Sequence, residues 1–567
     1  MMTGSRMFMA RPVLKLIPAS FLVLALSLFA RLPAQAASSP TTATTDVEVK
    51  PVCGDAMVVG SIGDARTLVP ILASDSSSQD IVGMIFNGLV KYDKDLNIVG
   101  DLAREWSVSP DGLKIIFHLR PDVRWHDGHP FTARDVEYTF KRLTDPLVRT
   151  PYAGDFERVK EFIVLDDHTV SVLYKEPFSP ALASWSMWIM PRHLLEKEDL
   201  NKTAFSRAPV GTGPYRFRRW KTQEKIELVA NKDYFDRRPF IDRYLYRVIP
   251  DEATIFLELQ TGGIDMAPLS PLQFSRQTDT PFFARYYQKY RLPSFGYTYL
   301  GYNLIDERFK DRRVRQALNG AVDKKEIVRI VLSGFGEPAT GPFIPDSWAY
   351  DRSVNAAEFD PHRACALLDE AGWRTRDREG WRVKDGRRFE FTITTNQGSD
   401  ERVKVAEIIQ RRLKDVGVKV TIRVVEWSVF VTECINKRKF EAVLLGWGLG
   451  RDPDNYDIWH SSRTGEGQFN FVGYHNDEVD RLLTLGRRSF DQKERADCYH
   501  RVHRLIYEDQ PYMFLYVPDR LLILHKRFQG VKPAASGIGY NFNDWWVPRS
   551  LQKYHLPQAS GKERLDR

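Results

Sequence analysis

The sequence has few cysteines and lacks the short motifs that mark common catalytic and metal sites. Only four cysteines, Cys53, Cys365, Cys434 and Cys498, occur among its 567 residues. Their wide spacing excludes a compact zinc module but permits disulfides in an exported protein. The sequence contains no G-x-S-x-G elbow, no H-E-x-x-H pair and no phosphate loop with its lysine. These absences leave no named class of enzyme, although an enzyme is still an alternative at this point, and we expect no metal and no cofactor.

The apolar run at residues 16–30 is too short for a membrane span, which needs roughly 20 residues. Three basic residues precede it and Ala-Gln-Ala follows at 34–36, as in a secretory signal peptide. We predict that residues 1–36 are removed and that the periplasmic chain begins near Ala37. Cys53 lies well past this point, so we expect no lipid anchor on a new N-terminal cysteine.

The charged residues form no one-sided basic stripe. The formal net charge is +8, and it becomes +4 without residues 1–36, which hold four basic and no acidic residues. Acidic and basic side chains alternate in mixed runs such as "DEVDRLLTLGRR". Because nucleic-acid binding needs a basic face, we expect no nucleic-acid partner.

The mature chain of about 530 residues is too long for one hydrophobic core, so we expect two or three domains. Aromatic residues make up 12% of the chain and include 13 tryptophans, which suits a protein that encloses an organic ligand. We find no internal repeat, no low-complexity tract and no long linker.

Helix and strand signals alternate along the chain, which favours α/β domains. In the first half, a turn at 109–112 and a strand at 113–119 precede a helix with Thr132 as its N-cap. Further along, apolar residues at helical spacing predict one helix over 312–332. Additional strands are predicted at 387–395, 418–426 and 440–448.

The segment "GWGLGRDPDN", residues 446–455, continues the predicted strand at 440–448. Ligands of open α/β sheets bind at such carboxyl ends of strands. Phosphate binding is not favoured, because no lysine follows the glycines at the required spacing. Calcium binding is not favoured either, because Pro453 and Tyr456 break the ligand pattern.

Two histidine pairs raise the alternative of a metal site. His126 and His129 flank Asp127 in "WHDGHP", but Asp-Gly followed by His-Pro is turn chemistry. His500 and His503 are spaced i, i+3, which does not match the metalloprotease motif. We interpret the second pair as surface histidines of an amphipathic helix.

Six segments follow one another in an order that resembles the family 5 extracellular solute-binding proteins, the peptide- and nickel-binding receptors of ABC importers. They are "LAREWSVSPDG…FKRLTDP" (102–146), "PVGTGPYRF" (209–217), "NKDYFDRRP…IPDEAT" (231–254), "VRQALNGAVDKKEIV" (314–328), "GWGLGRDPDNYDIWHSS" (446–462) and "LIYEDQPYMFLY" (505–516). The resemblance covers essentially the whole mature chain.

The resemblance implies two α/β lobes joined by two crossing strands, with an extra subdomain inserted in the first lobe. Carried onto this sequence, it places the parts as follows: lobe I at 54–297, the inserted subdomain at about 86–208, lobe II at 298–516, the return to lobe I at 517–553 and a flexible tail at 554–567. The crossings would lie near 297–303 and 515–520.

The implied function is binding without covalent chemistry. Ligand binding would favour the closed arrangement of the lobes, and an inner-membrane permease with its ATPase subunits would recognise this form of a monomeric receptor. The implied ligand is a small peptide, of oligopeptide rather than fixed dipeptide length. Two alternatives stay open: a non-peptide solute such as a metal chelate, haem or a glycan, or an exported hydrolase.

In this resemblance the segment at 446–455 becomes the floor of a peptide cleft. Gly446, Gly448 and Gly450 permit close approach of a ligand backbone, and Trp447 can form the wall of a side-chain pocket. Related receptors hold the ligand's ammonium group with an aspartate at the position of Gly450. Asp452 and Asp454 are candidates to replace it, although either can equally cap the following segment.

Further candidates carried by the resemblance lie at the edges of the expected cleft. They are Thr67, Tyr302, Asn303, Asn396, Gln397 and Trp427. Tyr302 and Trp427 can also be core aromatics, and Asn396 can simply close a turn. Arg402 is an approximate match to an arginine that holds the ligand carboxylate in dipeptide receptors. Because Cys53 would fall in lobe I and the other cysteines in lobe II, a bridge from Cys53 would resist opening, and we expect none.

Overall fold

The computed structural model describes residues 50–554. The predicted signal peptide and its cleavage point lie outside the described residues. No helix within residues 50–554 is long and apolar enough to cross a membrane.

The first large sheet has seven strands, and we call the part of the chain around it lobe I. Strands β1 and β10 pair in parallel, whereas β10, β9 and β8 form an antiparallel meander. In spatial order the strands are β12 (Tyr287–Leu292), β22 (Arg520–His525), β11 (Met266–Pro268), β1 (Gly54–Ser61), β10 (Ile241–Val248), β9 (Lys225–Ala230) and β8 (Tyr215–Lys221). Its helices are α1 (Ser76–Ile85), α6 (Glu252–Thr261) and α7 (Pro281–Tyr286).

A smaller antiparallel sheet is inserted between α1 and β8, and we call this part the inserted subdomain. Its strands are β4 (Ala103–Val108), β5 (Lys114–Leu119), β7 (Thr169–Tyr174) and β6 (Val159–Asp166), next to the pair β2 (Val90–Tyr92) and β3 (Ile98–Gly100). Its helices are α2 (Ala133–Leu143), α3 (Ala153–Phe156), α4 (Ala181–Ser184) and α5 (Arg192–Leu195). The predicted N-cap is confirmed, because Thr132 and Asp135 form a reciprocal capping box at α2.

The second large sheet has six strands and forms the centre of lobe II. In spatial order they are β14 (Gly336–Pro338), β21 (Tyr512–Pro518), β13 (Gly296–Tyr302), β20 (Ala442–Gly448), β18 (Glu390–Asn396) and β19 (Lys419–Val425). A small sheet holds β15 (Thr375–Arg376), β16 (Arg382–Lys384) and β17 (Arg387–Arg388). The helices are α8 (Glu307–Lys310), α9 (Arg312–Gly320), α10 (Lys324–Ile330), α11 (Pro361–Glu370), α12 (Asp400–Asp415), α13 (Trp427–Val429), α14 (Tyr456–Trp459), α15 (Asp477–Gly486) and α16 (Gln492–Asp509).

The prediction of a single helix over 312–332 is wrong. The segment divides into α9 and α10 because the Asp323 carboxylate accepts the backbone N–H of Glu326 and starts a second helix.

Alternation along the central strands of lobe II buries both faces of its sheet. Tyr297 and Tyr299 of β13 belong to one hydrophobic cluster, and Leu300 and Tyr302 belong to the cluster on the other side. The same period of two residues appears in β21. The central strands are therefore covered on both faces, and only their ends can face a ligand.

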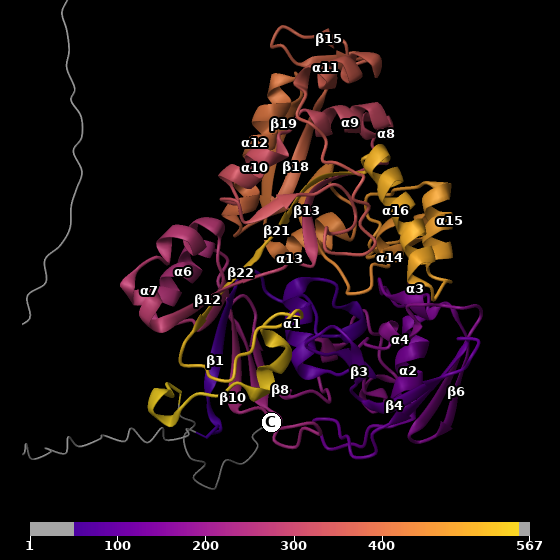
Figure 1. Ribbon diagram of the computed structural model, residues 1–567, viewed down its shortest axis with the longest axis vertical. Coiled ribbons are helices and arrows are strands. Elements are labelled where there is room, and N and C mark those ends of the chain that lie inside the picture. Colours follow the sequence, from indigo (N-terminus) through magenta and orange to yellow (C-terminus); the bar gives the residue numbers. More distant parts are fainter. Residues whose placement is uncertain (1–49, 555–567) are drawn as a thin grey trace, which may run out of the picture. The chain divides into compact units, whose positions relative to one another are not determined.

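The chain passes between the two large sheets twice, as Figure 1 shows. Residues 293–295 connect β12 of lobe I with β13 of lobe II, and Asp519 connects β21 with β22. Both connections are short, so a change in the angle between the lobes would be concentrated there. Figure 1 also shows α3 of the inserted subdomain beside α14 and α15 of lobe II.

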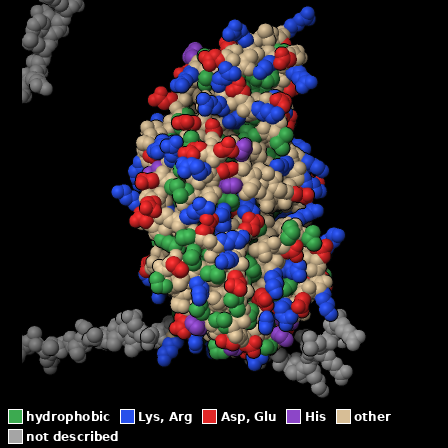
Figure 2. Space-filling model, turned by 90° about the vertical axis from the view of Figure 1, so that its right-hand side faces the viewer, with side chains coloured by type: hydrophobic (Ala, Val, Ile, Leu, Met, Phe, Trp, Pro, Cys, Tyr) green, Lys and Arg blue, Asp and Glu red, His purple; other side chains and the backbone are tan. Residues whose placement is uncertain are grey.

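The four cysteines are free, with Cys53 exposed and Cys434 and Cys498 buried. Figure 2 shows basic and acidic side chains interspersed on the face that it presents.

Candidate ligand-binding cleft

A cavity of about 830 Å³ lies between the two lobes. This volume falls within the range of roughly 300–1,000 Å³ that is typical of ligand pockets. Its lining comes from lobe I at 74–79, from the inserted subdomain at 92, 152–156 and 180–188, and from lobe II at 294–298, 402, 427–436, 445–458 and 467–471.

The floor of the cavity is the end of β20, which leaves one edge of its backbone without a strand partner. On one side, Ala442–Gly448 pairs with β13 over its whole length. On the other side, only Ala442 and Val443 pair with β18. From residue 444 to 448 that edge therefore has no strand partner among the described residues, although the Leu444 carbonyl accepts the Thr395 hydroxyl at 3.0 Å.

The glycines of β20 keep this edge open to the cavity. A Cβ atom built on Gly448 would meet no heavy atom within 4 Å, and one on Gly450 would approach only the Asp452 carbonyl, at 3.5 Å. A Cβ on Gly446 would lie 3.3 Å from the Tyr297 carbonyl. All three glycines line the cavity, so a ligand backbone can come close to the strand there.

Two tryptophans form apolar walls of the cavity. The Trp447 ring packs against Phe469, with ring centroids 5.3 Å apart, and its Nε1 donates to the Tyr512 hydroxyl at 3.3 Å. Trp427 of lobe II reaches lobe I, where its Nε1 lies 3.5 Å from the Asp75 carboxylate. Both rings belong to lobe II, and Trp427 extends its wall as far as lobe I.

Asp452 and Asp454 are held by arginines of lobe II. Arg495 Nη2 donates to Asp452 at 2.6 Å, and Arg487 Nε donates to Asp454 at 2.6 Å. Each aspartate also accepts a backbone N–H two residues further on, which is the capping alternative of the sequence analysis. Asp454 thus has a partner on each carboxylate oxygen, whereas both contacts of Asp452 are made to its Oδ1 atom, so Asp452 stays a candidate for the role of the aspartate missing at position 450.

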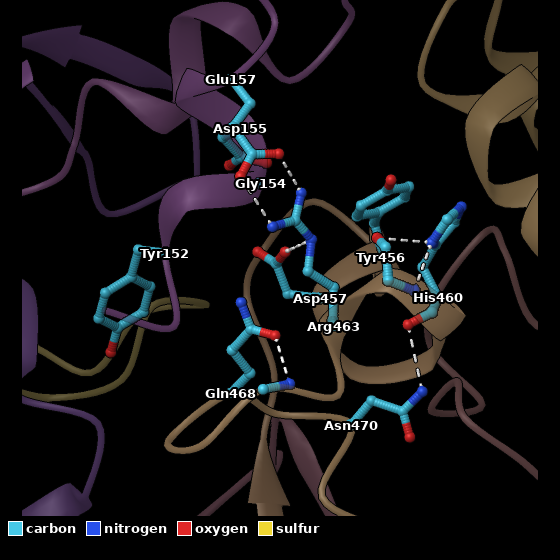
Figure 3. A network of polar contacts seen from close by, with 12 residues as sticks. Tyr152, Gly154, Asp155, Glu157, Tyr456, Asp457, His460, Arg463, Gln468 and Asn470 are labelled. Carbon is cyan, nitrogen blue, oxygen red and sulfur yellow. Dashed lines mark hydrogen bonds and ion pairs between the residues drawn. The ribbon is translucent and has the colours of Figure 1, made fainter. Parts of the chain in front are cut away.

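An ionic network joins the inserted subdomain to lobe II at the rim of the cavity (Figure 3). Arg463 donates to both carboxylate oxygens of Glu157, at 3.1 and 2.5 Å, and lies 3.4 Å from Asp457. Arg487 bridges Asp155 of α3 and Asp454. These contacts cross from one lobe to the other, so they exist only while the lobes are close together.

Burial changes the acidities within this network. It raises the pKa of Asp457 to about 7 and that of Asp454 to about 6, and it raises the pKa of Asp155 as well. The pKa of Glu157 is instead lowered, chiefly by its hydrogen bond with Arg463. Asp155, Asp454 and Asp457, together with Glu157, contact only two guanidinium groups, those of Arg463 and Arg487. The network therefore has more carboxylates than cations.

Of the predicted site residues, seven line the cavity: Gly446, Trp447, Gly448, Gly450, Asp452, Asp454 and Trp427. Thr67, Tyr302, Asn303, Asn396 and Gln397 do not line it.

Local contacts explain why these five residues do not line the cavity. Tyr302 and Asn303 lie at the far end of β13, where Tyr302 is fully buried against Phe309 and Asn303 donates to the Phe440 carbonyl. Thr67 caps its own loop by accepting the N–H of Val69.

Asn396 and Gln397 end β18 beside the cavity but turn away from it. Asn396 is fully buried and accepts a hydrogen bond from Arg402, which does line the cavity. Asn396 therefore positions a cavity residue, and the Gln397 backbone N–H pairs with the Val425 carbonyl.

Sequence reasoning missed residues contributed by the inserted subdomain and by the loop itself. Tyr152, Asp155 and Trp188 line the cavity from a part of the chain that carries no recognisable binding motif. Arg451 and Asp457 lie within or next to the segment at 446–455, and their charged side chains could have marked them as candidates from the sequence.

The two histidine pairs are structural. His126 is half-buried and contacts the Gly213 carbonyl at 3.0 Å, and desolvation lowers its pKa to about 4. The interpretation of His503 as a surface residue is wrong, because it is fully buried and contacts the Thr340 hydroxyl. Within residues 50–554, no group of histidine, cysteine and acidic side chains is arranged to hold a metal ion.

Comparison with known proteins gives a consistent result. The family model described as "Bacterial extracellular solute-binding proteins, family 5 Middle" matches residues 97–469. The oligopeptide-binding protein AppA of Bacillus subtilis is 34% identical over 515 residues, which cover 88% of this chain and 93% of that protein. The structure of that protein with a nonapeptide matches with a TM-score of 0.84 and covers 88% of this chain and 100% of its own.

Two further solved structures are similar over nearly their full lengths. NikZ of Campylobacter jejuni, in complex with Ni(L-His), is 30% identical with a TM-score of 0.79, and the match covers 87% of this chain and 99% of that one. DppA of Helicobacter pylori, in complex with the peptide STSA, is 27% identical with a TM-score of 0.80, covering 88% and 99%. The predicted α/β fold class of two-lobed binding proteins is confirmed by these matches.

Proposed function

The chain belongs to family 5 of the bacterial extracellular solute-binding proteins, and from this premise we propose that it binds oligopeptides between its two lobes for an ABC importer. The family consists of binding proteins and not of enzymes, so the alternative of an exported hydrolase is set aside. Relatives with this fold hold a nonapeptide, the peptide STSA or Ni(L-His), and the first two ligands support the choice of a peptide.

The observation that carries the proposal is the unpaired edge of β20 at the floor of the cavity. An extended peptide offers N–H and C=O groups at regular intervals, whatever its side chains are. The backbone from residue 445 to 448, which lines the cavity, can pair with those groups as an added strand, and Gly448 leaves room for it. Such pairing is independent of ligand sequence, which suits a receptor of broad specificity.

Ligand side chains would then be received by the aromatic walls. Trp447 and Trp427 line the cavity from lobe II, and Tyr152 and Trp188 line it from the inserted subdomain. Asp454 has a partner on each carboxylate oxygen and Asp452 is held by Arg495, so we propose that these aspartates fix an amino terminus less tightly than an unpaired aspartate would. We therefore favour peptides of variable length over a fixed dipeptide.

For transport, the permease must distinguish the ligand-bound receptor from the empty one. The ionic contacts between α3 and lobe II, together with the Trp427–Asp75 contact, stabilise the arrangement in which the lobes enclose the cavity. A peptide that touches both lobes would favour the same arrangement. The permease would then recognise this closed form of a monomeric periplasmic receptor, cleaved from its signal peptide near Ala37 and without a lipid anchor.

Substitution at Gly448 tests the proposal directly. Its φ angle is ordinary and a Cβ there meets nothing within 4 Å, so Gly448→Val should fold normally while its side chain occupies the space above the β20 edge. Gly539→Val is the matched control, because a Cβ at Gly539 also meets nothing within 4 Å and the residue lies outside the cavity.

The assay is titration with synthetic copies of the peptides that co-purify with the protein. We expect Gly448→Val to weaken binding at least about tenfold, because the loss of one or two hydrogen bonds adds to the steric conflict. The control should bind like the wild type. Wild-type affinity in both variants would refute a peptide lying on β20.

A further inference from the structure

Arg451 is a cation in the wall of the cavity that no acidic group compensates. Its guanidinium carbon lies 3.4 Å from the centre of the Phe295 ring. Among the described residues it makes no ion pair within 4 Å and no side-chain hydrogen bond, and its Nη1 atom is buried without an acceptor. By contrast, Arg463, Arg487 and Arg495 around the same cavity are each paired with carboxylates.

Arg451 is partly exposed, and the buried Nη1 atom of its guanidinium has no acceptor, which is energetically unfavourable. Desolvation favours the neutral form of a group, and here burial and the positive charge of Arg520 together lower the pKa of Arg451. Arginine nevertheless stays charged in proteins, so an anion in the cavity would compensate this charge more fully than water does. Carboxylates match the planar fork of a guanidinium with two parallel hydrogen bonds.

The position of Arg451 makes it accessible to a ligand and sensitive to closure. Phe295, on which it stacks, belongs to the first connection between the lobes, and Arg520 begins the strand after the second. Tyr92 of the inserted subdomain lies close enough for its charge state to be affected by Arg451. A group bound to Arg451 would therefore lie between lobe II and the inserted subdomain, next to both connections.

The charge distribution of the rest of the cavity supports an oriented ligand. At the rim near α3, the carboxylates of Asp155, Glu157, Asp454 and Asp457 share two guanidinium groups. Asp457 Oδ1 accepts no hydrogen bond there. The cavity thus has an unpaired cation, Arg451, beside the connections between the lobes and an excess of carboxylates at the rim near α3. This electric field favours a ligand carboxylate at Arg451 and disfavours it near α3.

We propose that Arg451 is a carboxylate subsite, which holds either the C-terminal carboxylate or an acidic side chain of the bound peptide. The inference rests on the proposed function, since it names the part of a peptide ligand that Arg451 selects. Arg402, the arginine suggested by the resemblance to dipeptide receptors, is already hydrogen-bonded to Asn396 and is the weaker candidate.

The test uses native mass spectrometry with defined peptide libraries. The full exported protein is freed of ligand by unfolding and refolding, then mixed with a tetrapeptide library that lacks Asp and Glu, either as free acids or as C-terminal amides. A second pair of amidated libraries carries Glu or Gln at one position. The first pair reports on the C-terminal carboxylate and the second on an acidic side chain.

We expect wild-type protein to prefer the carboxylate-bearing member of one pair at least about tenfold, as a charge-assisted bidentate contact would give. Arg451→Gln should abolish that preference while retaining binding of the uncharged member. Arg451→Lys should keep part of it, because lysine preserves the charge but not the fork. Arg285→Gln is the control, since Arg285 is an exposed arginine of α7 beside an aromatic ring, outside the cavity.

Thermal unfolding of each variant checks that it is folded. Equal binding of acid and amide, and of Glu and Gln, by the wild type would overturn the inference and leave the proposed function intact. A preference that persists in Arg451→Gln would overturn it as well. Failure of the wild type to bind any library would instead refute the proposed function, and the inference with it.

Discussion

Replacing Glu157 by glutamine removes one half of an ion pair that connects the lobes. Glu157 follows α3 of the inserted subdomain, and Arg463 belongs to lobe II. The Arg463 side chain is 6% exposed, whereas that of Glu157 is 50% exposed, so solvent screens the pair on one side only. For a bidentate pair with this exposure we expect a contribution of about 1 kcal/mol.

Because this contact forms only between the lobes, the substitution should act on closure and not on the folding of either lobe. A loss of about 1 kcal/mol from the closed form lowers the closed fraction, and with it the apparent affinity, about fivefold. Peptide titration by calorimetry measures the affinity, and small-angle scattering of the free protein measures the closed fraction. High salt should shrink the difference from the wild type.

The pH dependence of the same contact has a defined sign. Arg463 lowers the pKa of Glu157 below its ordinary value of 4.5, so the stabilisation is fully present above that value and is lost as the pH falls below it. Glu161→Gln is the matched control, because Glu161 is exposed on the same subdomain and forms no ion pair among the described residues. Unchanged affinity of Glu157→Gln at low salt would refute the claim that this pair stabilises closure.

Three other predictions concern Asp457, Trp459 and the cysteines. Burial raises the pKa of Asp457 from 3.8 to about 7, so the folded protein holds a proton that the unfolded chain has lost; stability should fall as the pH rises between these values, and Asp457→Asn should flatten that fall in thermal scans. Trp459→Ala should cost about 3–5 kcal/mol in urea unfolding, and Trp459→Phe should cost less, since the buried Nε1 makes no hydrogen bond. Thiol titration should find exposed Cys53 the most reactive cysteine of the native protein, partly buried Cys365 slower, Cys434 and Cys498 protected, and all four reactive after denaturation; fewer than four would reveal a disulfide.

The sequence predicted the fold class well because the signals that define it are local. The alternation of helices and strands, the N-cap at Thr132 and the strand that ends at Gly448 each depend on neighbouring residues. The resemblance to a known family then supplied the order of the lobes, which no local pattern contains. The division of the helix at 312–332 was missed, since Asp323 acts as a cap inside a continuous apolar period.

The binding site was predicted less completely because half of it comes from elsewhere in the chain. The glycines and Trp447 lie in one segment and could be recognised together, whereas Asp155 and Trp188 reach the cavity only through the packing of the inserted subdomain. The arginines that occupy Asp452 and Asp454 lie 43 and 33 residues away in the sequence. Which carboxylates are paired and which guanidinium is unpaired is therefore a property of the tertiary structure alone.

The most direct test of the central claim is native mass spectrometry of the protein purified from producing cells, before and after mild unfolding. If the cavity binds oligopeptides of many sequences, the spectra will show a series of bound masses that resolves, on release, into peptides of varied sequence and length. A single defined small molecule that is not a peptide would contradict this claim.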